Sequence, residues 1–491
     1  MTTITTMFRL GRGPLRLLAR PGTIMATGAA LLLGACDFDI PNTNAPTVEE
    51  VTGNPSRATL ARVATGIFSN NLTDVGGDIQ FYGIYGRELY NLQGNDPRET
   101  NEQIRGPLDP GGRGGGLWGA KYQAIRTINA YLAALENPTG LTQGEIRASR
   151  GFALTMKAHM FSRLAVRTGA LGIPIAVDQP ITADPAPFVS FADAMQYASD
   201  LYDEGLAELQ AAGSAAFPFT VAPGFALFAN PAEFAKYNRA LAARQFAYRA
   251  TFNACAACWQ SALTALQQSF LTTSGLPASL GVGAYYGYSS AAGEPSNPVT
   301  ENLTSLRYWS HPSIITGAQL KADNNPDNRL PNKLREAATP RVLNDLTGTH
   351  KPILYNINTP TSSTADLGAD IAIIKNEELI LLRAEANLGL GNRQLALDDI
   401  NLVRINSGGL PQSPLTAASS NADILTELLY NRVYSMMWEH GVRWIDARRY
   451  NRLNTLPLDR PGDTVFDNMI IPAAECDARG MATPCEPPIG G

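Results

Sequence analysis

The sequence predicts a mainly α-helical protein made of tetratricopeptide-like helical hairpins with long irregular loops. Apolar residues recur every three or four positions along several long segments, which is the helical period. Between these segments lie stretches rich in Gly, Pro, Asn, Ser and Thr that are longer than ordinary connections. One segment also has small residues at the spacing that lets the two helices of a hairpin pack closely. With 491 residues, the chain is long enough for two or three domains or for one large helical domain.

Eight segments carry the helical pattern, and irregular stretches separate or follow them. We expect helices over 56–72, 115–136, 143–167, 191–212, 231–252, 257–269, 371–405 and 423–447. We expect irregular structure over 73–114, 170–189, 213–229, 271–340, 356–368 and 451–491. Loops of this length are uncommon unless they carry a function. The helices are therefore expected to form a scaffold, and the loops at about 73–114 and 271–340 to form ligand-binding excursions.

The tetratricopeptide pattern is clearest in residues 378–404. The small residues are Ala384, Gly391 and Ala396, and Ile400 and Val403 follow them. Residues 118–165 make a weaker second case. Stacked repeats of this kind offer surface to a protein partner, but a generic α-hairpin explains the same pattern.

The first 35 residues predict an export signal. They contain four arginines and no acidic residue, and their apolar part, residues 24–35, is shorter than the roughly 20 residues that span a membrane. Leu33-Gly34-Ala35-Cys36 resembles the lipobox of bacterial lipoproteins, in which the cysteine is lipidated and the signal is cut before it. The alternative is an ordinary signal peptide with a chance cysteine. The predicted division is a signal peptide at 1–35 and one domain at 36–491, held on a membrane by the lipid on Cys36.

The charge balance argues against nucleic acid as a partner. The formal net charge is −5, and removal of the four arginines at the N-terminus would bring it to −9. Anionic membranes and nucleic acids attract basic proteins rather than acidic ones.

Four cysteines follow Cys36, and they form two close pairs. An even number in an exported chain favours disulfides. The candidates are Cys255 with Cys258 and Cys476 with Cys485. Free thiols, a redox dithiol and a metal site remain as alternatives, although the gap in the second pair is too long for the usual zinc knuckle.

Other chemical motifs are missing from the sequence. The four histidines show none of the spacings of a metal site, and there is no nucleophile elbow, P-loop or dinucleotide fingerprint. Residues 322–329 have a calcium-like run of aspartates but lack the bidentate glutamate, so a polar turn is the simpler interpretation. We therefore expect no metal, no cofactor and no enzymatic activity.

Aromatic residues in the long loops are candidates for ligand binding. A sugar ring stacks its CH face on an aromatic ring while polar neighbours bind its hydroxyls. The candidates are Tyr82, Tyr85, Tyr90, Asn91, Tyr285, Tyr286, Tyr288 and Trp309. The alternative is that most of these rings only pack the loops onto the scaffold.

An ordered series of motifs resembles the SusD/RagB family of nutrient-binding outer-membrane lipoproteins. The series begins with Trp118, Tyr122, Ile125 and Asn129, and continues through Gly172-Ile173-Pro174 to the closing Met469–Glu475. Between them stands the C-terminal signature Glu439, Gly441, Arg443, Trp444, Asp446 and Arg448. The chain departs from the family at Asn431-Arg432, where Glu-Arg is usual. With the lipobox, the resemblance covers nearly the whole chain.

The C-terminal signature alternates charges beside two tryptophans. Arg443 lies three to five positions from the other three charged residues, Glu439, Asp446 and Arg448, so several are expected to share one helix face as a buried ion network. The alternative is a glycoside hydrolase that uses Glu439 and Asp446. Nearby arginines would lower the pKa of these carboxyls, which does not suit a general acid.

The resemblance implies a SusD-like α superhelix that captures an oligomeric nutrient, most simply a glycan, although a peptide fits as well. It also implies delivery to a SusC-like TonB-dependent transporter in the outer membrane, with the protein facing the cell surface. The second hypothesis is a periplasmic tetratricopeptide-like lipoprotein scaffold that binds other proteins.

Overall fold

The computed structural model describes residues 51, 53–180, 182–359, 361 and 363–490. The predicted signal peptide and the lipidation residue Cys36 lie outside the described residues and stay predictions. Within the described part, no helix is both long enough and apolar enough to cross a bilayer.

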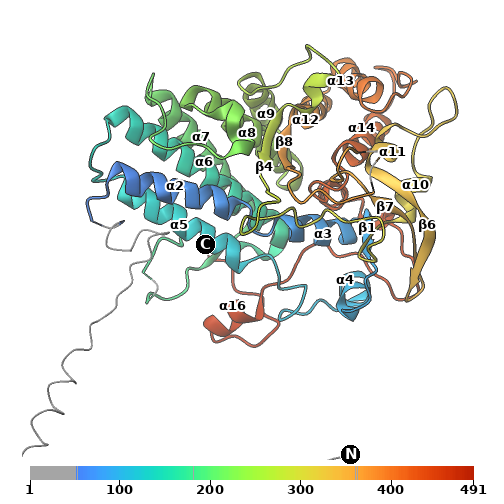
Figure 1. The fold of residues 1–491 in the computed structure, drawn as a ribbon, viewed down its shortest axis with the longest axis horizontal. Coiled ribbons are helices and arrows are strands. Elements are labelled where there is room, and N and C mark those ends of the chain that lie inside the picture. The colour runs from blue at the N-terminus through green and yellow to red at the C-terminus, as the bar shows by residue number, and fades with distance from the viewer. Residues whose placement is uncertain (1–50, 52, 181, 360, 362, 491) are drawn as a thin grey trace, which may run out of the picture. The chain divides into compact units, whose positions relative to one another are not determined.

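The long helices pack in the order in which the chain forms them (Figure 1). They are α2 (Arg57–Asn71), α5 (Gly119–Ala134), α6 (Gln143–Thr168), α7 (Phe191–Ala211), α8 (Pro231–Phe252), α9 (Ala257–Gln267), α12 (Asn376–Gly389), α13 (Arg393–Asn406), α14 (Asn421–Met436) and α15 (Val442–Arg449). Each contacts the next, and α9 bridges from α8 to α12. Figure 1 shows α2 and α5–α8 on one side and α12–α14 on the other. The prediction of a mainly helical fold is confirmed.

Polar caps fix where these helices begin. Thr142 and Glu145 form a reciprocal capping box at the start of α6. The Ser190 side chain accepts one free N–H of α7, that of Asp193, and the Asn230 side chain, followed by Pro231, accepts that of Glu233 in α8. The predicted starts of these three helices, at 143, 191 and 231, agree with the observed ones.

The hairpin of α12 and α13 is the one that the tetratricopeptide pattern predicted. Ala384 and Ala396 are fully buried where the two helices meet, and Ile400 and Val403 join the same apolar cluster. Gly391 has another role than predicted. Its φ of 82° places it in the left-handed turn between the helices, where a side chain would be strained.

Two predicted helices are broken. Residues 371–405 begin with strand β8 (Ile371–Lys375) before α12, and the turn at Gly391 then separates α12 from α13. Residues 423–447 divide into α14 and α15, because the chain turns through Trp438 with a φ of 68°. Glu439 therefore does not share a helix with Asp446, contrary to the prediction.

The irregular stretches also contain short elements. The short helices are α3 (Val75–Tyr85), α4 (Glu102–Arg105), α10 (Pro312–Thr316), α11 (Arg329–Lys333), α16 (Ala473–Ala478), η1 (Pro97–Glu99), η2 (Gly169–Leu171), η3 (Pro223–Phe228), η4 (Ala278–Gly281) and η5 (Leu453–Thr455). Helix α3 was predicted as loop because glycines interrupt its apolar pattern. It is a buried helix that packs on α15.

Four two-stranded antiparallel sheets tie distant segments together. The pairs are β1 (Leu89–Asn91) with β5 (Tyr308–Ser310), β2 (Ile173–Pro174) with β3 (Phe188–Val189), β4 (Gly283–Tyr286) with β8, and β6 (Leu334–Leu343) with β7 (Leu346–Pro352). Two of these pairs, β1–β5 and β4–β8, join strands that are far apart in sequence, and they connect the excursion at 271–340 to residues 89–91 and to the strand before α12.

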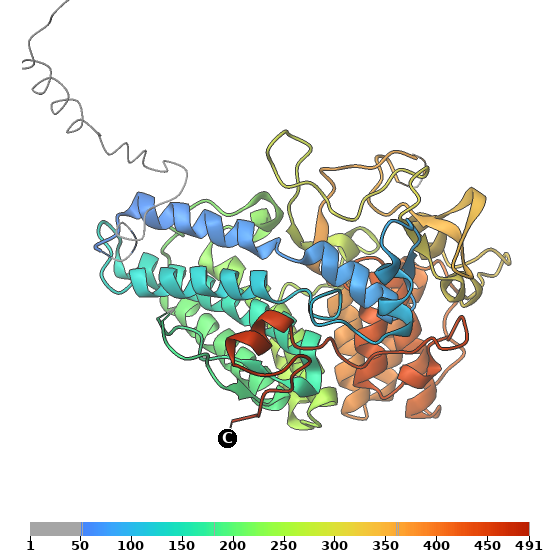
Figure 2. The same cartoon turned by 90° about the horizontal axis from the view of Figure 1, so that it is seen from below.

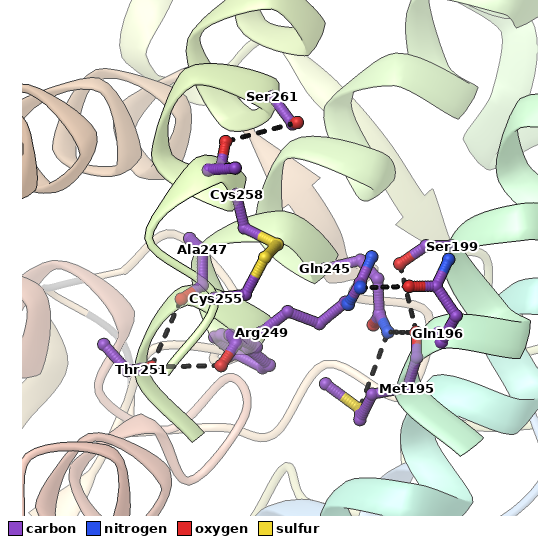
Figure 3. The surroundings of a disulfide bond; sticks show 12 residues. Met195, Gln196, Ser199, Gln245, Ala247, Arg249, Thr251, Cys255, Cys258 and Ser261 are labelled. Atoms are coloured by element: carbon purple, nitrogen blue, oxygen red, sulfur yellow. Dashed lines mark hydrogen bonds between the residues drawn. A yellow bond between two sulfur atoms is a disulfide. The ribbon is translucent and has the colours of Figure 1, made fainter. Parts of the chain in front are cut away.

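Two disulfides are present. Cys255 and Cys258 are joined at 2.03 Å, at the turn between α8 and α9 (Figure 3). Beside this turn, Gln245 on α8 donates a 2.7 Å hydrogen bond to the Met195 carbonyl on α7, so the helix is already fixed to its neighbour. Cys476 and Cys485 are joined at 2.09 Å and connect α16 to the C-terminal segment.

Asp446 of the C-terminal signature belongs to a buried ion network. Asp446 accepts from Arg432 at 2.6 Å and from Arg449 at 2.8 Å, and Glu385 pairs with Arg449. All four side chains are buried, and they come from α12, α14 and α15. A buried ion network is present, but of the four predicted residues only Asp446 belongs to it. Arg443 and Arg448 instead donate to the backbone carbonyls of Arg87 and Val166.

Glu439 belongs to a separate set of charges. Its Oε1 accepts from the Lys375 ammonium at 2.6 Å and lies 3.4 Å from that of Lys333. Its partners are thus lysines, where the sequence suggested arginines.

Replacing Asp446 by alanine is expected to lower the free energy of unfolding by about 3–5 kcal/mol, because Arg432 and Arg449 would remain buried without this carboxylate. Chemical denaturation followed by circular dichroism measures the loss. The control is Asp398→Ala on the exposed face of α13, which should change stability by no more than about 0.5 kcal/mol. Equal, small losses in both variants would contradict the structural role of the network.

Removing the two disulfides is expected to cost different amounts. In the chain-entropy account a longer closed loop stabilises more. The Cys476→Ser/Cys485→Ser variant, with a sequence separation of 9, should lose about 3 kcal/mol. The Cys255→Ser/Cys258→Ser variant, with a separation of 3, should lose about 2 kcal/mol. The reverse order in thermal or chemical denaturation would show that local packing, and not loop closure, decides the contribution.

Candidate functional site

An open pocket lies where the end of α2 meets three loop segments. Its volume is about 580 Å³, within the range of small-ligand sites. The walls come from residues 65–72 of α2, residues 220–225, residues 285–295 and residues 368–370. Figure 2 shows the yellow and orange loop segments gathered on one side of the molecule, next to the blue helices α2 and α3.

Strand β4 places two tyrosines on opposite sides of the pocket wall. Its pairing with β8 shifts register between Ala284 and Tyr285, and such bulges redirect side chains. Tyr285 is half-buried and lines the pocket, whereas the next residue, Tyr286, is 5% exposed and points to the interior. Gly224 permits this arrangement, because a Cβ there would lie 2.1 Å from the Tyr285 carbonyl oxygen.

Hydrogen bonds hold the two loop walls together. The Tyr288 backbone N–H donates to Asp370 Oδ1 at 3.1 Å. The Asn297 side chain donates to the Ala369 carbonyl at 2.7 Å, so the segments after β4 and before β8 cannot separate freely. The Ser289 N–H closes the first loop on the Pro295 carbonyl. The pocket is therefore built by chain segments about 80 residues apart in sequence.

The pocket combines aromatic rings with unpaired polar atoms. Phe68, Tyr285 and Tyr288 supply the rings. Asn71 is 1% exposed and lines the pocket, and within the described part of the chain its Oδ1 has no hydrogen-bond partner. The Tyr288 hydroxyl is likewise unpartnered there. Burial raises the pKa of Tyr288, so this hydroxyl stays neutral at physiological pH. Rings beside free acceptors and hydroxyls suit a ligand with both an apolar face and hydroxyl groups.

A second, smaller cavity lies behind Tyr286. Its volume is about 90 Å³, which is room for about three water molecules. Ion pairs line it, with Arg163 on Asp78 and Arg244 on Glu378.

The histidines of this inner cavity are neutral. Burial lowers the pKa of His440 to about 4, and the nearby Arg244 adds to the shift. His159 is also held uncharged by burial, which lowers its pKa, and its Nε2 lies 2.9 Å from the Tyr286 hydroxyl. The inner cavity thus holds paired charges and uncharged histidines in a volume that suits water better than an oligomer.

The structure separates the eight ligand-binding candidates. Tyr285 and Tyr288 line the open pocket, and Tyr286 lies between the two cavities. Tyr82 lines the inner cavity. The rings of Tyr82 and Tyr85 both pack on Trp444. These last two rings are buried because α3 is a core helix and not a loop.

The other three candidates belong to the β1–β5 pair. Tyr90 lies opposite Trp309 in the register, and both rings are buried. Asn91 donates to Glu99 at 2.6 Å and accepts from the Gln93 N–H. In this conformation these side chains offer no surface to a ligand, and their contacts explain the aromatic residues as packing.

Sequence reasoning missed most of the pocket lining, including Phe68, Asn71, Glu294 and Asp370. Phe68 and Asn71 lie on α2, which was assigned to the scaffold, and Glu294 and Asp370 lie in stretches without a motif. The only signal available was the aromatic run at 285–288, which marks one wall.

The catalytic alternative finds no suitable acid. Burial raises the pKa of Glu439, but the charges of Lys375 and Lys333 outweigh it and hold that pKa below the ordinary value. A general acid needs a raised pKa and an open cleft, whereas Glu439 and Asp446 are both buried. Among the described residues, no group of three His, Cys, Asp or Glu side chains could hold a metal ion.

Solved structures with the same fold are known, although the sequence itself has no match. No protein-family model and no curated protein matches the sequence. Among solved structures, NanU from B. fragilis aligns with a TM-score of 0.64 at 13% identity, over 91% of this chain and 100% of that one. A SusD superfamily protein from Bacteroides vulgatus gives 0.64 at 15% identity, over 87% and 98%. A SusD-like protein from Bacteroides fragilis gives 0.64 at 13% identity, over 89% and 97%. At these identities the likeness shows the fold, and the chain has the fold of SusD superfamily proteins.

Proposed function

We propose that this SusD-fold protein is a nutrient-binding lipoprotein of the outer membrane. It captures an oligomeric nutrient, most simply a glycan, and delivers it to a SusC-like TonB-dependent transporter. The observation that carries the proposal is the open pocket, in which half-buried tyrosines lie beside unpaired polar atoms.

The pocket supports a glycan because it offers both kinds of contact that a sugar needs. The rings of Tyr285 and Tyr288 give apolar surface for the CH face of a pyranose. Asn71 Oδ1 and the Tyr288 hydroxyl are buried without a hydrogen-bond partner among the described residues, and an unpaired buried acceptor is costly until a ligand or water pairs with it. A peptide with an aromatic or hydroxylated side chain could use the same contacts.

The placement in the membrane rests on the N-terminus. A lipobox at residues 33–36 would give Cys36 its acyl chains, such as palmitate, and hold the domain on the outer membrane facing the cell surface. The helical side would dock on the transporter, and the loop-rich side would present the ligand. In this proposal the protein binds and transfers, and it catalyses no reaction and needs no cofactor.

The second candidate is a periplasmic scaffold for other proteins. The α12–α13 hairpin favours it, because Leu395 and Ile405 are 54% and 50% exposed on α13. Exposed aliphatic side chains on a tetratricopeptide-like hairpin suit a protein partner. This candidate has no use for the open pocket, and we rank it second for that reason.

Alanine at Tyr285 or Tyr288 is expected to weaken glycan binding about tenfold, the equivalent of ~1.4 kcal/mol, because the stacking ring is lost. Isothermal titration calorimetry with oligosaccharides selected on a glycan array measures the change. Tyr197→Ala is the matched control, since Tyr197 is half-buried on α7 outside the pocket. A loss as large in the control, or none in either pocket variant, would remove the pocket from the binding site.

The complete chain with a C-terminal tag is expected to co-purify from membranes with a large β-barrel transporter in stoichiometric amount. The Cys36→Ser variant should lose incorporation of labelled palmitate and leave the membrane fraction. Recovery without any barrel protein, or with periplasmic proteins alone, would contradict the uptake model and favour the scaffold.

A further inference from the structure

The open pocket has acidic side chains and no basic one. Glu294 and Asp370 line it, and none of the described residues of its wall is a lysine, an arginine or a histidine. Both carboxylates are exposed at the pocket. A third carboxylate, Asp366, lies close enough that its charge, together with burial, raises the pKa of Asp370. The charged side chains that line the pocket are therefore all acidic.

The nearest cationic groups behind the wall do not offset this charge. Arg163 lies 6.0 Å from the centre of the Tyr286 ring and pairs with Asp78 at 2.8 Å. Arg244 lines the same inner cavity and pairs with Glu378 at 2.6 Å. Because each guanidinium already has a carboxylate, neither is available to an anionic ligand in the open pocket.

An unpaired acceptor in the pocket wall is a second, independent observation. Asn71 is 1% exposed and its Oδ1 has no partner within the described part of the chain. Asn71 lines the same pocket as the two carboxylates, which are acceptors only when ionised. A ligand that satisfies this wall brings O–H or N–H groups to it, and an ammonium group brings positive charge as well.

We infer that the pocket selects glycans without acidic groups and favours those that carry free amines. This inference rests on the proposed function, since it names the class of glycan for the same pocket. The expected order of affinity is amino sugar, then neutral sugar, then uronic or sulfated sugar. A carboxylate or sulfate placed beside Glu294 and Asp370 would meet like charge and find no basic partner, which costs affinity.

The test is a glycan array followed by calorimetry with three tetramers of one β-1,4 backbone: cellotetraose, the glucosamine tetramer and the glucuronate tetramer. Malto-, xylo-, chito- and galacturono-oligosaccharides on the array cover other linkages. We expect the acidic members to bind at least about tenfold more weakly than neutral members of the same length. Added salt should weaken binding of the amino sugars and hardly change that of the neutral ones.

The double variant Asp370→Asn/Glu294→Gln tests the assignment to these side chains. Asn at 370 can still accept the Tyr288 N–H, so the loop contact is kept. The ratio of neutral to acidic affinity should fall towards one in this variant. Asp398→Asn, an exposed carboxylate on α13 outside the pocket, should leave the ratio as it is.

The outcomes separate the two proposals. If neutral or amino glycans bind, acidic ones do not, and the double variant removes the difference, the inference holds. If acidic glycans bind as tightly as neutral ones, or if the double variant leaves the ratio unchanged, the inference is wrong while the proposed function stands. If no glycan of any class binds, the glycan-binding function fails and the inference fails with it.

Discussion

The carboxylate of Asp446 lies between two buried arginines, and much of the C-terminal half depends on this pairing. Arg432 comes from α14 and Arg449 from α15, and Glu385 on α12 joins the set. Charges that leave water destabilise the fold unless they are paired, so the three helices are held at one separation. The same pairing also positions Trp444, because Trp444 lies on α15. Its ring packs on those of Tyr82 and Tyr85 in α3. The network thus orients a helix with which it shares no ion pair.

Scaffold and pocket are built by different means. The helices depend on dense apolar packing, where the loss of a few methyl groups is costly. The pocket walls depend on single hydrogen bonds between loops, such as that from Tyr288 to Asp370. Its carboxylates, Glu294 and Asp370, are exposed, so an exchange there is expected to change ligand chemistry more than stability. The two parts share residues, since Phe68, Phe225 and Tyr286 pack in the core and also line the pocket.

The sequence was sufficient for most of the helices, because the 3.6-residue period of apolar residues is a local signal. It was not sufficient for the breaks. Trp438 has a positive φ, which its residue type does not predict. The five residues of β8 were predicted as helix because a short buried strand is as apolar as a buried helix. The pocket could be predicted only in part. Tyr285 and Tyr286 are neighbours on β4, so their side chains point to opposite faces, and which of the two faces the pocket depends on how β4 pairs with β8. Asn71 became visible only once the loops were placed against the end of α2.

The contact of Gly224 with Tyr285 sets a rule for redesign of the pocket. A Cβ at position 224 would collide with the Tyr285 carbonyl, so η3 and β4 form a frame that any larger residue there would force apart. Tyr288, Glu294 and Asp370 stand outside that frame, in loops whose side chains face open space. Substitutions at these positions could therefore replace hydrogen-bond acceptors by donors and so change which ligand the pocket binds. The contact between η3 and β4, which keeps the pocket open, would be unchanged.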